Sequence, residues 1–320
     1  MKKLLKIGGI VLAIIVLAIT TFVVFINVKG IPSYDVPEIS YSINPTPEKI
    51  ARGKKLAVML CKNCHMNPET QELTGKRMMD APPEFGTVYS QNITNDKNYG
   101  IGDWTDAEIM YLIRTGIKKD GMYAPPYMAK LPNLADEDME AIISWLRSDD
   151  KMMNSKEAVP DRPCEPSFLT KFLSNVAFKP LPMPTEVVQM PDTTNQVELG
   201  KYYVTNLECF TCHSEDFKTV NMLTPEATPG FLGGGNLLLN MEGEVMLSSN
   251  ITKDKATGIG TWNKQRFVKA VRSGIMENEP ALRYPMVPYP QLTEYEAGAI
   301  YEYLQTVAPL SNPVKRSMIE

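Results

Sequence analysis

An internal repeat constrains the organisation of this chain more than any other feature. The pattern Asn-Ile-Thr-x-Asp-Lys-x-x-Gly-Ile-Gly-x-Trp occurs at residues 92–104 and again at residues 250–262. Nine of the 13 positions are identical, at a constant offset of 158 residues. A fixed offset of this kind indicates copies of one folding unit. Because 320 residues also suit about two domains, we expect two homologous domains in tandem.

The residues that follow each copy of the motif predict an amphipathic helix. Apolar residues recur there at i, i+3, i+4 and i+8, the spacing of one helix face, as Ile109, Leu112, Ile113 and Ile117 and as Phe267, Ala270, Val271 and Ile275. Thr105 and Asn263 suit the N-cap, and Gly116 and Gly274 suit the C-terminal end.

Two further helices are expected in each copy. One, at residues 53–60 and 200–208, leads into a Cys-x-x-Cys-His sequence, and a later one contains Ala141 in the first copy and Ala299 in the second. We therefore expect an all-α protein with one domain at residues 46–150 and another at residues 192–320, which includes a C-terminal tail.

The segment between the two domains, residues 151–191, contains seven prolines. This composition predicts a linker on the surface, with one short helix at residues 167–175. The second copy also has ten extra residues between its Cys-x-x-Cys-His and its Asn-Ile-Thr motif. The stretch between these two motifs contains residues 233–235, three consecutive glycines that predict a tight turn.

The N-terminus predicts a membrane anchor. Three lysines precede an uncharged run at residues 7–28, and a helix of that length spans a hydrocarbon core of about 30 Å. A cleaved signal peptide would have a shorter apolar region and a small-x-small cleavage site. We expect residues 1–30 to be an uncleaved anchor with a cytoplasmic N-terminus, which leaves the domains on the periplasmic or outer face of the cytoplasmic membrane. Residues 31–45 contain three prolines and predict an extended stalk that lifts the body off the membrane.

The chain has two histidines, and each directly follows a Cys-x-x-Cys sequence. His65 follows Cys61 and Cys64, and His213 follows Cys209 and Cys212. This pattern fits c-type haem attachment, in which two thiols bond to one porphyrin and the histidine binds its iron. A shared zinc site would need ligands from both domains to converge, and a disulfide framework would not explain where the histidines are. We expect two covalently attached haem c groups.

A haem that only carries electrons needs a second axial ligand, and no further histidine is present. Methionine is the natural choice because it raises the reduction potential. Of the 19 methionines, only Met128 and Met286 are related by the offset of 158. Both lie in proline-rich loops predicted between helices. Met122 and Met276 are the nearest competitors. For any single methionine, a core-filling role is the usual alternative.

Three other features have open interpretations. Trp104 and Trp262 could pack against a haem or only in the core, and Arg114 and Arg272 could pair with haem propionates or be solvated. Cys164, in the linker, is expected to be a free thiol without an assigned role.

Composition excludes several classes of function. The net charge is −4, so the chain lacks the basic footprint of a nucleic-acid-binding protein. Both histidines are committed to the two motifs, which leaves none for a histidine-based catalytic triad or a three-histidine zinc centre. We therefore assign no catalytic residues.

On these motifs the chain resembles tandem class I cytochromes c, over about residues 46–150 and 192–310. The repeated motif and the methionine loop that follows it are similar to cytochrome c subunits of membrane-bound alcohol and gluconate dehydrogenases. The resemblance implies thioether bonds at the four motif cysteines, His65 and His213 as proximal ligands, and Met128 and Met286 as distal ligands.

The expected function is electron transfer. Such a dihaem cytochrome would pass single electrons between a membrane or periplasmic donor and a terminal acceptor of a respiratory chain, without bond chemistry of its own. Expected partners are redox proteins: a dehydrogenase, a quinol-oxidising complex or a terminal oxidase. The alternatives are a dihaem peroxidase-like enzyme with one open haem site, and a docking subunit of a larger respiratory complex.

Overall fold

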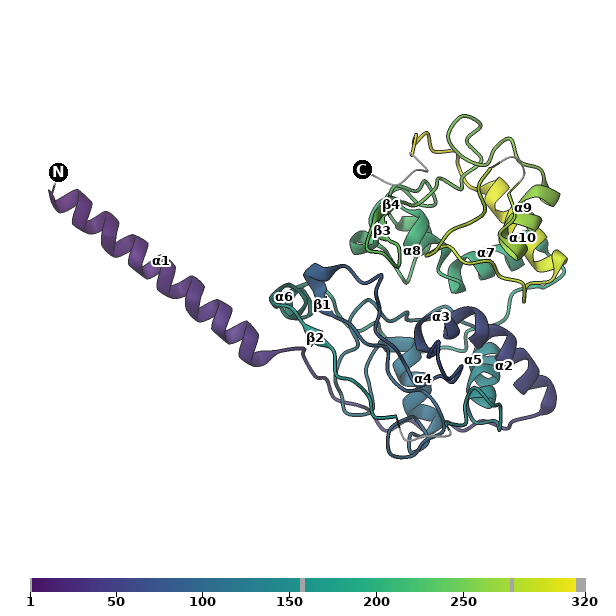
Figure 1. The fold of residues 1–320 in the computed structure, drawn as a ribbon, viewed down its shortest axis with the longest axis horizontal. Helices are drawn as coiled ribbons and strands as arrows, with labels where there is room; N and C mark the ends of the chain where they lie inside the picture. Colours follow the sequence, from purple (N-terminus) through teal and green to yellow (C-terminus); the bar gives the residue numbers. More distant parts are fainter. Residues whose placement is uncertain (1, 156–158, 277–278, 315–320) are drawn as a thin grey trace.

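The computed structural model describes residues 2–155, 159–276 and 279–314. One long helix, α1 (Lys2–Lys29), projects from a body of two helical units (Figure 1). The first unit contains α2 (Pro47–Leu60), α3 (Lys62–His65), α4 (Asp106–Thr115) and α5 (Asp136–Leu146). The second unit contains α7 (Gln196–Asn206), α8 (Cys209–His213), α9 (Lys264–Ser273) and α10 (Glu294–Thr306). The linker between them forms α6 (Phe168–Val176).

The remaining regular structure is short. In the described part of the chain it comprises three 3-10 turns, η1 (Pro83–Phe85), η2 (Phe217–Thr219) and η3 (Pro225–Ala227). Two antiparallel ribbons complete it, β1 (Gly86–Thr87) with β2 (Glu165–Pro166), and β3 (Leu237–Leu239) with β4 (Val245–Leu247). The fold is therefore mostly helical, as expected, and the two ribbons were not anticipated because their strands are only two or three residues long.

The helix ends follow the expected sequence signals. Thr105 and Thr293 form capping boxes with the glutamates three residues later. Asn263 caps α9 through its side chain, and Gly116 and Gly274 end α4 and α9 with φ angles of 82° and 73°. The helix expected at residues 167–175 is α6, whose N-cap is Ser167.

Each unit is held together by a close crossing of its first and last long helices. At the crossing of α2 and α5, a Cβ atom on Gly53 would lie 1.8 Å from the carbonyl oxygen of Ala141. At the crossing of α7 and α10, a Cβ atom on Gly200 would lie 2.0 Å from the carbonyl oxygen of Ala299. Only glycine fits at either place, because the facing atoms are backbone and cannot rotate away.

Residues 31–45 differ from the expected stalk. They are extended, but they contact the first unit instead of lifting it. The Tyr34 N–H donates to the Gly121 carbonyl at 2.9 Å, and the Ile43 N–H donates to the Asp106 carboxylate at 3.3 Å. Ile39 and Tyr41 pack against the core between these points. Alternating apolar side chains thus bind the segment to the body. The expectation of a stalk rested on the prolines and did not take these apolar side chains into account.

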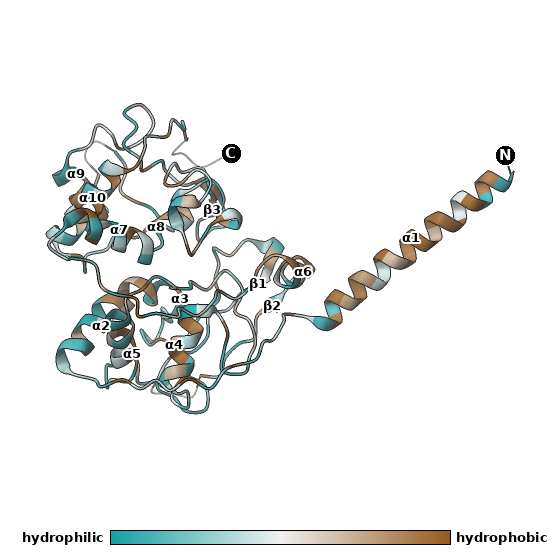
Figure 2. Cartoon of the chain, turned by 180° about the vertical axis from the view of Figure 1, so that it is seen from behind, coloured by the Kyte–Doolittle hydropathy of each residue, from teal (hydrophilic) through white to brown (hydrophobic). Residues whose placement is uncertain are grey.

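α1 is the one helix in the described part of the chain that is long and apolar enough to cross a membrane. The mean hydropathy of its most apolar window is 3.0, and 6% of that window is buried. Figure 2 shows hydrophobic residues along most of α1, and its large apolar side chains are exposed at many successive positions. A helix with apolar side chains all round needs an apolar surrounding.

The extra residues of the second copy contact the first unit. The Gly75 N–H donates to the His65 carbonyl at 2.8 Å, and the Gly234 N–H donates to the His213 carbonyl at 2.7 Å. Because these contacts correspond, the additional residues lie between His213 and Gly234 and contain η2 and η3. There Phe217 packs edge-to-face on Phe85 of the first unit, with ring centroids 5.9 Å apart.

The helix crossing generates a prediction about stability. Replacing Gly53 by Ala should lower the free energy of unfolding by about 1–3 kcal/mol, because the added methyl group must push two backbones apart. The measurement is thermal unfolding followed by helical circular dichroism. Gly298→Ala is the matched control, since that glycine is also helical and buried but a Cβ there meets only the flexible end of Lys264, 3.2 Å away. Equal stability of the two variants would contradict the role of the crossing.

Candidate functional site: two repeated Cys-x-x-Cys-His motifs

Each motif lies on a single helical turn at the end of a long helix. In the first unit, Cys61 follows α2 directly, and its carbonyl accepts the His65 N–H at 2.9 Å. In the second unit, Glu208 has a φ angle of 53° and separates α7 from α8, which contains the motif residues Cys209 to His213. Such a turn places two cysteines and a histidine close together on one segment.

Both histidines are oriented in the same way. The Nδ1 atom of His65 lies 2.7 Å from the carbonyl oxygen of Gln91, and that of His213 lies 2.7 Å from the carbonyl oxygen of Ser249. Because a carbonyl only accepts hydrogen bonds, Nδ1 must donate, and Nε2 keeps its lone pair for a metal. Burial lowers the pKa of both histidines, which favours the neutral form that a metal binds.

The repeated Asn-Ile-Thr motif supports these carbonyls. Gln91 and Ser249 immediately precede its two copies. The Asn92 side-chain oxygen accepts the Thr94 N–H at 2.9 Å and the Thr94 hydroxyl at 2.7 Å, and Asn250 binds Thr252 at the same two distances. The motif is thus a rigid loop that presents a backbone acceptor to each histidine. The sequence showed the repeat but gave no signal for this role, because the acting group belongs to the backbone.

The two methionine loops are fixed at matching points. In the first unit, Ala124 and Leu131 donate their N–H groups to the carbonyls of Gly116 and Ile113, at 2.7 and 2.8 Å. In the second unit, the corresponding bonds join Leu282 to Gly274 at 2.9 Å and Tyr289 to Val271 at 2.8 Å. Met128 and Met286 lie between these anchors and are half-buried, at equivalent positions of the two loops.

The competing methionines lie outside these loops. Met122 precedes the first anchor, pairs with Ser33 in a β-bridge and is 40% exposed. Met276 is two residues past Gly274, before the second loop is anchored. The two positions are not related by the offset of 158.

The equivalent arginines bind the backbone at the end of the methionine loops or just after them. Arg114 is 1% exposed, donates to the carbonyls of Leu131 and Pro132 at 3.0 Å and pairs with Asp136 at 2.6 Å. Arg272 donates to the Leu292 carbonyl at 2.7 Å and lies 3.4 Å from Glu294. Neither arginine is only a solvated charge, and Arg114 is fully committed to this backbone contact. The role was not evident from the sequence because carbonyl acceptors carry no residue signature.

The remaining candidate residues have structural contacts. Trp104 and Trp262 are partly buried against the core, and the Arg266 guanidinium lies 4.3 Å from the Trp262 ring centroid. The Cys164 sulfur exchanges hydrogen bonds with the backbone of Tyr89, at 3.4 Å as acceptor and 3.2 Å as donor. Cys164 is thus a free thiol that joins the linker to the first unit.

The geometry argues against a shared zinc site. Across residues 2–155, 159–276 and 279–314, no three histidine, cysteine, aspartate or glutamate side chains converge in a way that could hold a metal ion. Burial raises the pKa of Cys61 and Cys209 to about 12 and that of Cys64 to about 11. Burial thus favours the neutral thiol over the thiolate at these three positions.

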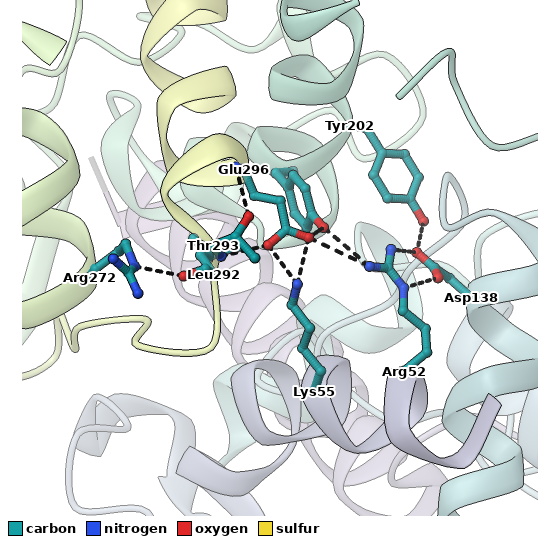
Figure 3. Close-up of polar contacts among 9 residues, drawn as sticks. Arg52, Lys55, Asp138, Tyr202, Arg272, Leu292, Thr293 and Glu296 are labelled. Carbon is teal, nitrogen blue, oxygen red and sulfur yellow. Dashed lines mark hydrogen bonds and ion pairs between the residues drawn. The ribbon is translucent and has the colours of Figure 1, made fainter. Parts of the chain in front are cut away.

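The two units contact each other reciprocally (Figure 3). Lys55 lies two residues after Gly53, and Tyr202 lies two residues after Gly200, so they are equivalent positions. Lys55 binds Glu296 of the second unit at 2.5 Å, while the Tyr202 hydroxyl donates to Asp138 of the first unit at 2.7 Å. Asp138 and Glu296 are the third residues of α5 and α10. The interface is thus nearly two-fold symmetric.

Further contacts join the two units. Arg52 binds Asp138 through two hydrogen bonds, at 2.8 and 2.9 Å, and also lies 3.7 Å from Glu296. The Tyr284 hydroxyl, from the loop of Met286, donates to Asp80 of the first unit at 2.6 Å. In Figure 1, α3 and α8 lie on the facing sides of the two units.

Comparison with known proteins identifies the first unit. Residues 50–149 match the family model for cytochrome c. Residues 50–149 are a cytochrome c domain. This domain contains the first Cys-x-x-Cys-His motif, its supporting loop, the first methionine loop and the α2–α5 crossing.

Three relatives extend the similarity to most of the chain. The cytochrome c subunit of a quinone-dependent alcohol dehydrogenase from Gluconacetobacter polyoxogenes is 26% identical over 78% of this chain and 54% of its own length. The fructose dehydrogenase cytochrome subunit of Gluconobacter japonicus is 26% identical over 88% and 56%. The gluconate 2-dehydrogenase cytochrome c subunit of Pantoea cypripedii is 27% identical over 70% and 51%. The chain thus spans about half the length of these curated cytochrome subunits.

The interface contact of Glu296 predicts a specific pH dependence. Burial alone would raise the pKa of Glu296, but hydrogen bonds from Lys55, Tyr203 and Thr293 outweigh it and lower the pKa from 4.5 to about 2. Ionised Glu296 therefore stabilises the fold above about pH 4.5, and this contribution is lost as the pH falls towards 2. Glu296→Gln should reduce stability at neutral pH and weaken the loss of stability between pH 4.5 and 2, measured by denaturant unfolding.

The control is Glu294→Gln on the same helix, whose side chain is 84% exposed. This variant should retain the acid dependence of the parent protein. If Glu296→Gln also retained that dependence, the ion pair with Lys55 would not be coupled to folding.

Proposed function

We propose that this protein is a membrane-anchored dihaem cytochrome c that transfers single electrons. The observation that carries the proposal is the repeated contact of each motif histidine with a backbone carbonyl at 2.7 Å, which leaves Nε2 available to iron in both units. Haem c supplies a one-electron couple when it is bound. The chain's own residues attach it, hold the two axial ligands in place and limit the access of water.

Each unit would hold one haem with a matching set of residues. Cys61 and Cys64 would form the thioether bonds in the first domain, with His65 and Met128 as axial ligands. In the second domain the corresponding set is Cys209 and Cys212, with His213 and Met286. The matching anchors of the two methionine loops support this choice over Met122 and Met276.

The domain organisation and topology are part of the proposal. Residues 1–30 form the anchor, 31–45 a segment bound along the first domain, 46–150 and 192–320 the two cytochrome c domains, and 151–191 the linker. Residues 315–320, the end of the C-terminal tail, lie outside the described residues. The lysines before α1 favour a cytoplasmic N-terminus and haem domains on the periplasmic face.

The relatives suggest the class of partner. They are named as cytochrome subunits of alcohol, fructose and gluconate dehydrogenases. We infer that this chain likewise accepts electrons from a dehydrogenase or a quinol-oxidising complex and passes them towards a terminal oxidase. In this role it catalyses no bond chemistry, although it can be a subunit of an oxidoreductase complex.

Ligand substitution tests the assignment of the methionines. Met128→Ala and Met286→Ala should each lower the reduction potential of one haem, because the thioether that favours the reduced iron is lost. Redox titration followed by visible absorption is the measurement. Met122→Ala and Met276→Ala are matched controls and should leave both potentials unchanged. A lowered potential in a control variant would move the assignment to that residue.

Ligand binding separates electron transfer from the peroxidase alternative. With both irons axially saturated, the reduced parent protein should bind carbon monoxide poorly and should not turn over hydrogen peroxide. Met128→Ala and Met286→Ala should each open one haem to carbon monoxide, seen in the Soret band. Ready binding or peroxide turnover by the parent protein would favour the dihaem peroxidase.

A further inference from the structure

The linker helix α6 has its polarity reversed relative to an ordinary surface helix. Its small polar side chains, Thr170 and Ser174, are buried against the first domain. Phe168, Leu169 and Val176 are exposed, by 38%, 37% and 53%. A surface helix of a soluble domain normally turns its apolar side inward, so the outer side of α6 calls for an apolar partner.

The partner is indicated by the position of α6 at the end of α1 (Figures 1 and 2). Phe172 packs edge-to-face on Phe22 of α1, with ring centroids 6.0 Å apart. The Lys171 ammonium group donates to the Asn27 side chain at 3.2 Å, and the Asn175 side chain donates to the Gly30 carbonyl at 2.9 Å. The apolar surface of α6 is therefore continuous with the apolar surface of α1.

The contacts with α1 also indicate how deep α6 would lie in a lipid interface. Phe22 lies five residues before Asn27, or about 7.5 Å along the helix axis. Interfacial helices bury their apolar sides by about 5–10 Å at the boundary of headgroups and acyl chains. Lys29, Lys171 and Lys179 lie near this end of α1 and on or just after α6, where ammonium groups can reach lipid phosphates.

A helix at the membrane surface would fix the orientation of the first domain, because α6 is bound to it closely. The Thr170 hydroxyl donates to the Phe85 carbonyl at 2.7 Å, and the Ser167 hydroxyl donates to the Glu84 carbonyl at 2.5 Å. Phe85 in turn packs on Phe217 of the second unit. Contacts thus run from α1 through α6 to both units.

The geometry points to a second membrane contact: α6 lies in the outer lipid interface, with Leu169 and Val176 among the acyl chains, and holds the haem domains in one orientation to the bilayer. This inference rests on the proposed membrane anchor, because α6 reaches the lipid surface only if α1 spans it. The partner is the lipid bilayer itself, and the lysines favour anionic headgroups.

Cysteine accessibility in the full-length, haem-loaded protein tests the inference. Single cysteines at Leu169, Val176, Val187 and Ile15 would be introduced in a Cys164→Ser background. Each variant would be reconstituted in vesicles of phosphatidylcholine and phosphatidylglycerol and treated with a membrane-impermeant maleimide. Val187 is the matched control, because it lies in the same linker and is 64% exposed. Each rate is divided by that of the same variant unfolded in detergent.

We expect the cysteines at positions 169 and 176 to react at least about tenfold more slowly than the cysteine at position 187, with the one at position 15 fully protected. Fast labelling at both 169 and 176 with protection at 15 would overturn the inference and leave the anchor standing. Fast labelling at 15 would overturn the proposed anchor and the inference together. The two tested sites on α6 guard against a local effect of one substitution.

Discussion

The close crossing of the first and last helices in each unit is the constraint on which the rest of the structure depends. Gly53 and Gly200 allow the backbone of α2 or α7 to approach a carbonyl of α5 or α10 at a distance that no side chain permits. The crossing fixes where each Cys-x-x-Cys-His turn begins, because the motif follows the first helix almost directly. It also places Lys55, Asp138, Tyr202 and Glu296 on one side of each pair, where they join the two units.

The supports of the proposed haem ligands in each unit are built from backbone atoms. One carbonyl, just before the Asn-Ile-Thr motif, orients each histidine. Arg114 and Arg272 bind other carbonyls, at the end of the first methionine loop and just after the second. A backbone acceptor at the end of a rigid loop cannot change rotamer, so it holds a ligand in place with little loss of side-chain entropy. This backbone role explains why the Asn-Ile-Thr motif is repeated although it contains none of the proposed iron ligands.

The two units are alike, but their connections are not. The extra residues between His213 and Gly234 contact the first domain through Phe217. The linker adds α6, which ties the first domain to the end of α1. These additions break the near symmetry of the interface and, in the proposed membrane arrangement, give the body a defined side towards the bilayer. An electron carrier held in this way would meet its partners with a restricted orientation.

The sequence by itself determined the repeat, the helix caps, the apolar N-terminal run and the cysteines and histidines proposed to bind haem. These features depend on local spacing, which is visible in one dimension. It did not reveal the acceptors of His65 and His213, the committed role of Arg114 or the course of residues 31–45 along the body. The tertiary structure decided these, because each involves a backbone group or a surface supplied by a distant segment. The reciprocal interface belongs to the same class, since equivalent residues meet only when the two units pack.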